Sequence, residues 1–255
     1  MTAKRTFAFL ASLTVVLAAN LANAADDAPA ADAPAADAPP APTAMTTPSM
    51  TGPLAANPKP TSFDLGDFGS WYVTGAVTGL GLWQNNHVPG DREALSDFSN
   101  GQVFIQKTAG EFQFFLQAGA YSLPSLGTAY LATHSATSDF YGVVPQAFIK
   151  YVPNDSFNIM AGKLPTLIGA EYTFTFENMN IERGLLWNQE NAVNRGIQAN
   201  FTSGPVAASV SWNDGFYSNR YNWLTASLAY TIDKANTLSF IAGGNTVDRK
   251  SVLLG

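Results

Sequence analysis

From Trp71 onward, the chain consists of short runs in which apolar and polar residues alternate. The run 111–118 places Phe112 on one parity and Gln113 on the other, with Phe115 as an exception. The same alternation recurs over residues 146–151, 197–202, 206–213, 224–232 and 237–245. A period of two is typical of β-strands, and no comparable run has the helical period. The pattern therefore predicts an all-β, antiparallel architecture.

The connections between these runs alternate between short and long. Short connections fall at residues 109–110, 153–155, 203–204 and 233–234, and long ones at about 84–100, 122–143, 164–194 and 214–222. Short turns at one end and long loops at the other are typical of outer-membrane barrels. We therefore predict an antiparallel up-and-down transmembrane β-barrel whose long loops are extracellular. A soluble two-sheet domain, with its polar parity in bulk water, is the alternative.

The two parities of the predicted strands differ in chemistry. The apolar parity, with Tyr151, Phe157, Phe201 and Tyr230 near the short turns, suits contact with lipid and an aromatic girdle at the membrane interface. The opposite parity is polar and is expected to line a pore. The predicted pore-lining residues are Gln113, Gln117, Gln146, Lys150, Asn158, Gln198, Asn200, Ser209, Ser211, Thr225 and Ser227.

The N-terminal part of the chain differs from the rest. A positive start, an apolar run at Phe7–Leu17 and the sequence Ala22-Asn23-Ala24 predict a cleaved signal peptide over residues 1–24. Residues 25–62 are rich in Ala, Pro and Asp, which predicts a disordered linker, either an inert spacer or a tether to the envelope. The predicted barrel spans residues 63–255. We expect the protein to be exported to the outer membrane of a Gram-negative bacterium.

The C-terminal end lacks the features of a finished barrel. The alternation supports nine strands and a tenth beginning near Asp248, and the last residue is Gly255 in place of an aromatic residue. An open sheet edge would leave backbone groups unsatisfied in lipid. The sequence is therefore expected to be the N-terminal part of a larger barrel.

Composition narrows the function classes. Only 13% of residues are charged, 46% are hydrophobic, and cysteine is absent, which excludes disulfides and Cys-ligated metal sites. The net charge of −6 argues against nucleic acid as a partner.

Catalytic and metal-binding patterns are weak. The two histidines, His87 and His134, lie in long connections and have no triad-like spacing. Asp91, Glu93 and Asp97 lack the defined spacing of a calcium loop. We therefore expect neither enzymatic activity nor a cofactor or metal.

Several motifs resemble a known family. Ala161–Glu171 reads Ala-Gly-Lys-Leu-Pro-Thr-Leu-Ile-Gly-Ala-Glu, and Glu182–Asn188 reads Glu-Arg-Gly-Leu-Leu-Trp-Asn. With Gly196–Ala199 and Trp212–Gly215, these segments resemble the OmpL-like family of outer-membrane β-barrel porins. Gly184 departs from the family pattern by separating the arginine from the leucine pair. The resemblance implies a larger single-chain barrel that acts as a porin.

The connection 164–194 is the longest and the third of the outward loops. By analogy with porins, it is expected to fold into the lumen and to form a constriction. Its candidate filter residues are Glu171, Glu177, Glu182 and Arg183, facing Lys150 as a basic wall residue, while Phe174, Phe176 and Trp187 would pack it against the wall. Acidic and basic groups on opposite sides of a pore select solutes by charge. An extracellular cap or a subunit contact is the alternative.

Two functional hypotheses follow. The first is an outer-membrane porin for passive diffusion of small hydrophilic solutes or ions, and the second is a barrel that acts as an adhesin or envelope tether. Outer-membrane lipid and lipopolysaccharide are the expected partners, and a homo-oligomer is left open. Lys163 and Arg195 fall on the lipid parity at the outer rim, where they could contact lipid phosphates unless a bulge turns them inward.

Overall fold

The computed structural model describes residues 61–168, 171–178, 180–185, 187–189, 191–234, 236–247 and 252–254. The predicted signal peptide and the predicted linker up to residue 60 lie outside the described residues.

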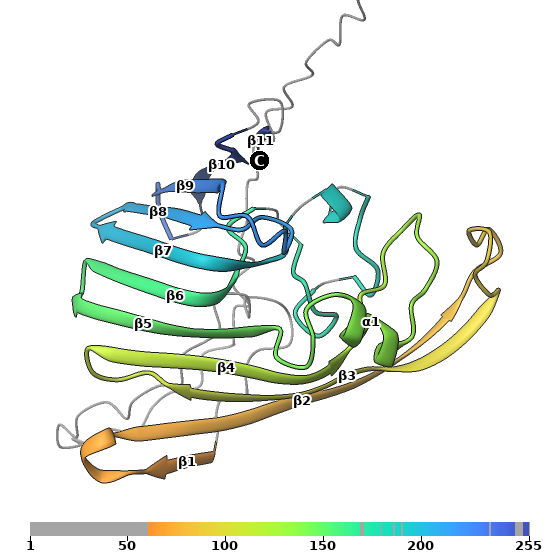
Figure 1. Ribbon diagram of the computed structural model, residues 1–255, viewed down its shortest axis with the longest axis horizontal. Coiled ribbons are helices and arrows are strands. Elements are labelled where there is room, and N and C mark those ends of the chain that lie inside the picture. Colours follow the sequence, from red (N-terminus) through yellow and green to blue (C-terminus); the bar gives the residue numbers. More distant parts are fainter. Residues whose placement is uncertain are drawn as a thin grey trace, which may run out of the picture.

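The described strands form one antiparallel sheet in which each strand pairs with its neighbour in the chain (Figure 1). The strands are β1 (Thr61–Asp64), β2 (Ser70–Trp83), β3 (Ala94–Lys107), β4 (Phe112–Tyr121), β5 (Gln146–Asn154), β6 (Phe157–Pro165), β7 (Val193–Ser203), β8 (Val206–Asn213), β9 (Trp223–Thr231), β10 (Thr237–Asn245) and β11 (Val252–Leu254). This order confirms the all-β, up-and-down prediction. Within the described residues the sheet is open, with β1 and β11 at its edges.

The connections follow the predicted alternation. In Figure 1 the short turns gather at the left end of the sheet and the long connections at the right end. The largest difference is at β3, which begins at Ala94, inside the loop predicted to extend to about residue 100. The β2–β3 hairpin continues outward past an irregularity between Thr78 and Gly79, where the pairing register shifts. Such a shift interrupts the alternation and so hides the outer part of a strand from a parity count.

Two short elements were not expected from the sequence. Strand β1 pairs with β2 and begins two residues inside the predicted linker. Helix α1 (Thr133–Asp139) lies in the β4–β5 connection, and its buried residues are Thr133, Ala136 and Thr137. Asp97 accepts hydrogen bonds from the backbone N–H and Oγ1 of Thr133, at 2.9 and 3.0 Å, and so caps this helix.

Two one-turn 3₁₀ helices complete the elements, η1 (Gly66–Phe68) and η2 (Trp187–Gln189). No helix among the described residues is long and apolar enough to cross a membrane.

The two faces of the sheet differ in burial. On the inner face a cluster of buried residues contains Phe104, Phe115, Phe148 and Met160 from four adjacent strands. On the outer face large apolar side chains are exposed, for example Ile149 at 62%. Large apolar faces of this kind are rare on soluble monomers. The predicted girdle residues Tyr151, Phe201 and Tyr230 belong to this exposed face.

Candidate functional site

The predicted pore-lining residues share the inner face. The strand register brings them opposite one another in the pairs Gln117–Gln146, Gln113–Lys150, Asn158–Asn200, Asn200–Ser209, Gln198–Ser211, Ser209–Ser227 and Ser211–Thr225. Directly opposed residues of an antiparallel pair have Cβ atoms only about 4.5–5.5 Å apart. The polar positions therefore form two runs on one face, one across β4 and β5 and one from β6 to β9, which we together call the polar ribbon.

Hydrogen bonds join the middle of the polar ribbon. Asn200 Nδ2 donates to Asn158 Oδ1 at 2.7 Å, while Ser209 Oγ and Gln198 Nε2 each donate to Asn200 Oδ1 at 2.8 Å. These contacts cross from β6 to β8, so they fix the orientation of neighbouring side chains. The ribbon is a preorganised polar surface on this part of the sheet.

The inner face is less uniformly polar than the sequence suggested. Phe104, Phe115, Phe148 and Met160 interrupt the polar parity and are all buried. The rings of Phe115 and Phe148 stack with centroids 5.3 Å apart. Phe115 was visible in the sequence as an exception to the alternation, and that exception marks where another part of the chain packs.

The segment that packs there is the β6–β7 loop (residues 166–192). Phe174 and Phe176 belong to the same buried cluster, and the Phe176 ring lies 5.7 Å from that of Phe104. Asn100 Nδ2 also donates to Thr175 Oγ1. The expected packing of Phe174 and Phe176 against the wall is confirmed, and the loop lies across the inner face of β3 to β6.

Arg183 anchors this loop. Its side chain is fully buried and donates to the carbonyl oxygens of Tyr172, Pro124, Ile181 and Thr173. Burial lowers the pKa of Arg183 to about 10, so the guanidinium stays charged at neutral pH. Two backbone hydrogen bonds join the same two segments. Arg183 N donates to Pro124 O at 3.0 Å, and Leu126 N donates to Arg183 O at 2.9 Å. Arg183 therefore ties the β6–β7 loop to the β4–β5 connection, and its charge does not face solvent.

The three predicted acidic filter residues lie in different surroundings. Glu177 is fully buried, whereas Glu171 and Glu182 are partly exposed. Both carboxylate oxygens of Glu171 accept the backbone N–H of Gly184 at 2.9 Å. Of these three residues, Glu182 is thus the partly exposed one whose carboxylate does not bind the Gly184 backbone.

Lys150, the predicted basic wall residue, lies on the inner face of β5 and is not fully exposed. In the part of the chain that the structure describes, the one ion pair joins Arg195 to Asp214. No ion pair there joins Lys150 to an acidic residue of the loop. Lys150 is therefore positioned by β5 and the acidic residues by the β6–β7 loop, without an ion pair between them among the described residues.

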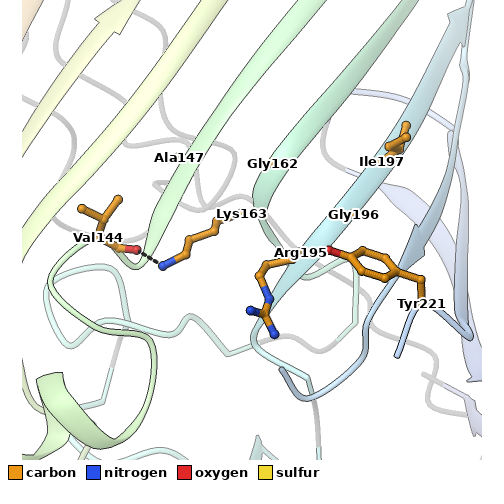
Figure 2. A pocket seen from close by; sticks show the side chains of 8 residues that line it. All are labelled: Val144, Ala147, Gly162, Lys163, Arg195, Gly196, Ile197 and Tyr221. Carbon is orange, nitrogen blue, oxygen red and sulfur yellow. Dashed lines mark hydrogen bonds between the residues drawn. The ribbon is translucent and has the colours of Figure 1, made fainter. Parts of the chain in front are cut away.

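Lys163 and Arg195 lie together on the outer face, beside an open groove of about 630 Å³ (Figure 2). They are directly opposed in the β6–β7 pairing. Arg195 forms a 2.7 Å ion pair with the buried Asp214, and its guanidinium carbon lies 4.4 Å from the centre of the Tyr217 ring. The structure thus keeps both cations at the outer rim, as their parity suggested.

The described residues include no group of three or more His, Asp, Glu or Cys side chains that could hold a metal ion.

The model of a family described as "Putative beta-barrel porin-2, OmpL-like" matches residues 70–252. No curated protein and no solved structure matches the chain. The matched range covers β2 to the start of β11 and so includes the polar ribbon and the β6–β7 loop.

Proposed function

Because the chain belongs to the OmpL-like family of β-barrel porins, we propose that it forms a water-filled pore for passive diffusion of small hydrophilic solutes or ions. The pore lies in an outer membrane, and the sheet closes into a barrel there. Closure satisfies the backbone groups of the edge strands, which lipid cannot do. The role is that of a channel, with no chemical step.

The polar ribbon is the observation that supports this proposal most strongly. Among the described residues, no hydrogen-bond partner is found for Gln117 Oε1, Gln198 Oε1, Thr225 Oγ1 or either polar side-chain atom of Gln146. Buried polar groups of this kind are normally satisfied, and water is their usual partner when protein groups are not. A polar wall with spare hydrogen-bonding capacity suits an aqueous lumen.

The outer face supports a membrane setting. Val77, Ile149 and Leu228 are exposed by 76%, 62% and 49%. Moving such a side chain out of water stabilises a protein by about 1.5–3 kcal/mol when it is fully buried. Near the short turns the rings of Phe112 and Tyr151 lie 5.0 Å apart, which fits an interfacial aromatic girdle. These exposed apolar side chains are suited to contact with lipid.

The β6–β7 loop narrows the pore in this proposal. It lies on the same inner face as the polar ribbon and is held by apolar packing and by Arg183. A loop fixed in this way presents charged groups such as Glu182 at a constant position. Fixed charges at a constriction act on permeating ions more strongly than charges in bulk water.

Conductance across a planar bilayer tests the proposed function. The full-length protein, refolded in detergent and added to a lipid bilayer, is expected to produce discrete, ohmic current steps. The same preparation unfolded by heat before addition serves as the control. A folded protein that inserts and carries no current would overturn the proposal and favour an adhesin or tether.

Ion selectivity tests the place of Glu182 in the constriction. A unit charge about 8 Å from a permeating ion contributes about 0.5 kcal/mol in water, so Glu182→Gln should lower cation preference about twofold. Glu111→Gln is the matched control, because Glu111 is exposed at a short turn at the other end of the sheet. Reversal potentials in a salt gradient measure both variants. An unchanged ratio in Glu182→Gln would place this carboxylate outside the ion path.

A further inference from the structure

The groove on the outer face crosses three adjacent strands, β5 to β7. Its floor is made of small residues, Ala147, Gly162 and Gly196, which allow a ligand to approach the sheet closely. The exposed side chains of Ile197 and Tyr221 stand at one side, each exposed by more than half, at 51% and 53%. Figure 2 shows Lys163 and Arg195 together at one end of this floor. The groove therefore combines a cationic end with an apolar wall.

The cationic end contains an unfavourable pairing. Lys163 and Arg195 are directly opposed on neighbouring strands, and like charges in that arrangement destabilise a sheet. Asp214 neutralises Arg195 through contacts to Nε and Nη2, both at 2.7 Å. Lys163 donates to the carbonyl oxygens of Val144 at 2.6 Å and Tyr141 at 3.2 Å, and its Nζ lies 5.6 Å from the centre of the Tyr217 ring. One positive charge is thus left without an acidic partner among the described residues.

Both cations keep capacity for another acceptor. An ammonium group has three donors, of which Lys163 uses two, and a guanidinium has five. Arg195 directs Nε and Nη2 to Asp214 and Nη2 also to the Tyr217 carbonyl, and no bond from Nη1 is found in the described part of the chain. Each side chain can therefore donate to an oxyanion that has several acceptor oxygens.

We propose that this groove binds an outer-leaflet lipid. Lys163 and Arg195 bind its phosphate group, and an acyl chain lies along Ile197 and Tyr221. The inference rests on the proposed outer-membrane setting, because it places the groove against lipid. The site lies on the lipid-facing parity at the end of the sheet where the long loops gather, which is the level of the outer headgroups. Trp212, whose ring lies 6.4 Å from that of Tyr221, adds an interfacial aromatic residue at the same level.

Lipid A is the probe for the test, since it carries both phosphate and acyl chains. The full-length protein in detergent is freed of lipid, and binding is measured by native mass spectrometry with phosphorylated lipid A, dephosphorylated lipid A or inorganic phosphate. A juxtamembrane lysine contributes about 1 kcal/mol to binding anionic lipid, so Lys163→Gln should weaken binding of phosphorylated lipid A about fivefold. Lys163→Arg should retain binding. Lys234→Gln is the matched control, because Lys234 is exposed at a short turn at the opposite end.

The outcomes separate the groove from the pore. Equal binding of phosphorylated lipid A by the unmodified protein and by Lys163→Gln would overturn the inference. Equal binding of dephosphorylated lipid A would show an apolar surface only, and Lys163-dependent binding of inorganic phosphate alone would assign the site to a free anion. Both results also overturn it. Conductance of Lys163→Gln is expected to match that of the unmodified protein, so a failure of the lipid site and a failure of the pore give different readings.

Discussion

Arg183→Met is expected to release the β6–β7 loop from the inner face. The substitution removes a buried cation that donates to carbonyl oxygens of both the β6–β7 loop and the β4–β5 connection. Leaving a buried acceptor of this kind unsatisfied typically costs about 1–3 kcal/mol. Because the strands do not depend on Arg183, we expect the sheet to form while the loop becomes mobile. Single-channel recordings should then show larger, noisier currents, and proteolysis should cut the loop first.

Arg220→Met is the matched control for this experiment. Arg220 is exposed in the β8–β9 connection, so its loss should change stability by less than about 0.5 kcal/mol. Quiet currents and unchanged proteolysis in Arg183→Met would contradict the anchoring role of Arg183. They would also contradict a constriction held in place by the contacts of this side chain.

Gly119→Ala is expected to prevent or severely weaken formation of the β3–β4 hairpin. Gly119 has φ of +143°, and an added Cβ would lie 2.1 Å from the carbonyl oxygen of Gly101 on the neighbouring strand. Side chains at such angles cost about 1–3 kcal/mol even without a clash, and this clash is with rigid backbone. The loss of folding free energy should therefore exceed about 2 kcal/mol. Urea titration of the refolded protein, followed by tryptophan fluorescence, measures it.

Gly81→Ala provides the comparison, since a Cβ at Gly81 meets no atom within 4 Å. Its unfolding midpoint should stay close to that of the unmodified protein. If the two alanine variants were equally stable, the close approach of β3 and β4 at Gly119 would be wrong.

The alternation of side chains predicted the strands well, because a strand facing lipid on one side and polar groups on the other has a strict period of two. Even the loop between β8 and β9, predicted at residues 214–222, has the bounds of the structure. The two missed elements lack this property. Strand β1 has four residues, and α1 packs through small and polar residues over seven positions, too few for a helical period.

The site was less predictable than the fold. The alternation of polar and apolar residues placed the polar ribbon on one face. It could not show that the Arg183 guanidinium donates its hydrogen bonds to backbone carbonyl groups. The Pro124 carbonyl lies 59 positions away along the chain, and backbone acceptors leave no mark in the sequence. Phe148 and Met160 also fall on the polar parity, and the alternation gives no reason for them. Both side chains belong to the buried cluster that includes Phe174 and Phe176 of the β6–β7 loop.

Accessibility of adjacent positions on β9 to water tests the central proposal most directly. The chain has no cysteine, so a single introduced thiol can be labelled selectively. Ser227 lies on the polar ribbon opposite Ser209, and the next residue, Leu228, is exposed on the outer face. During conductance recordings, a charged water-soluble thiol reagent should reduce the current through Ser227→Cys and leave Leu228→Cys unchanged. The opposite pattern, or equal labelling of both variants, would contradict a pore lined by the polar ribbon.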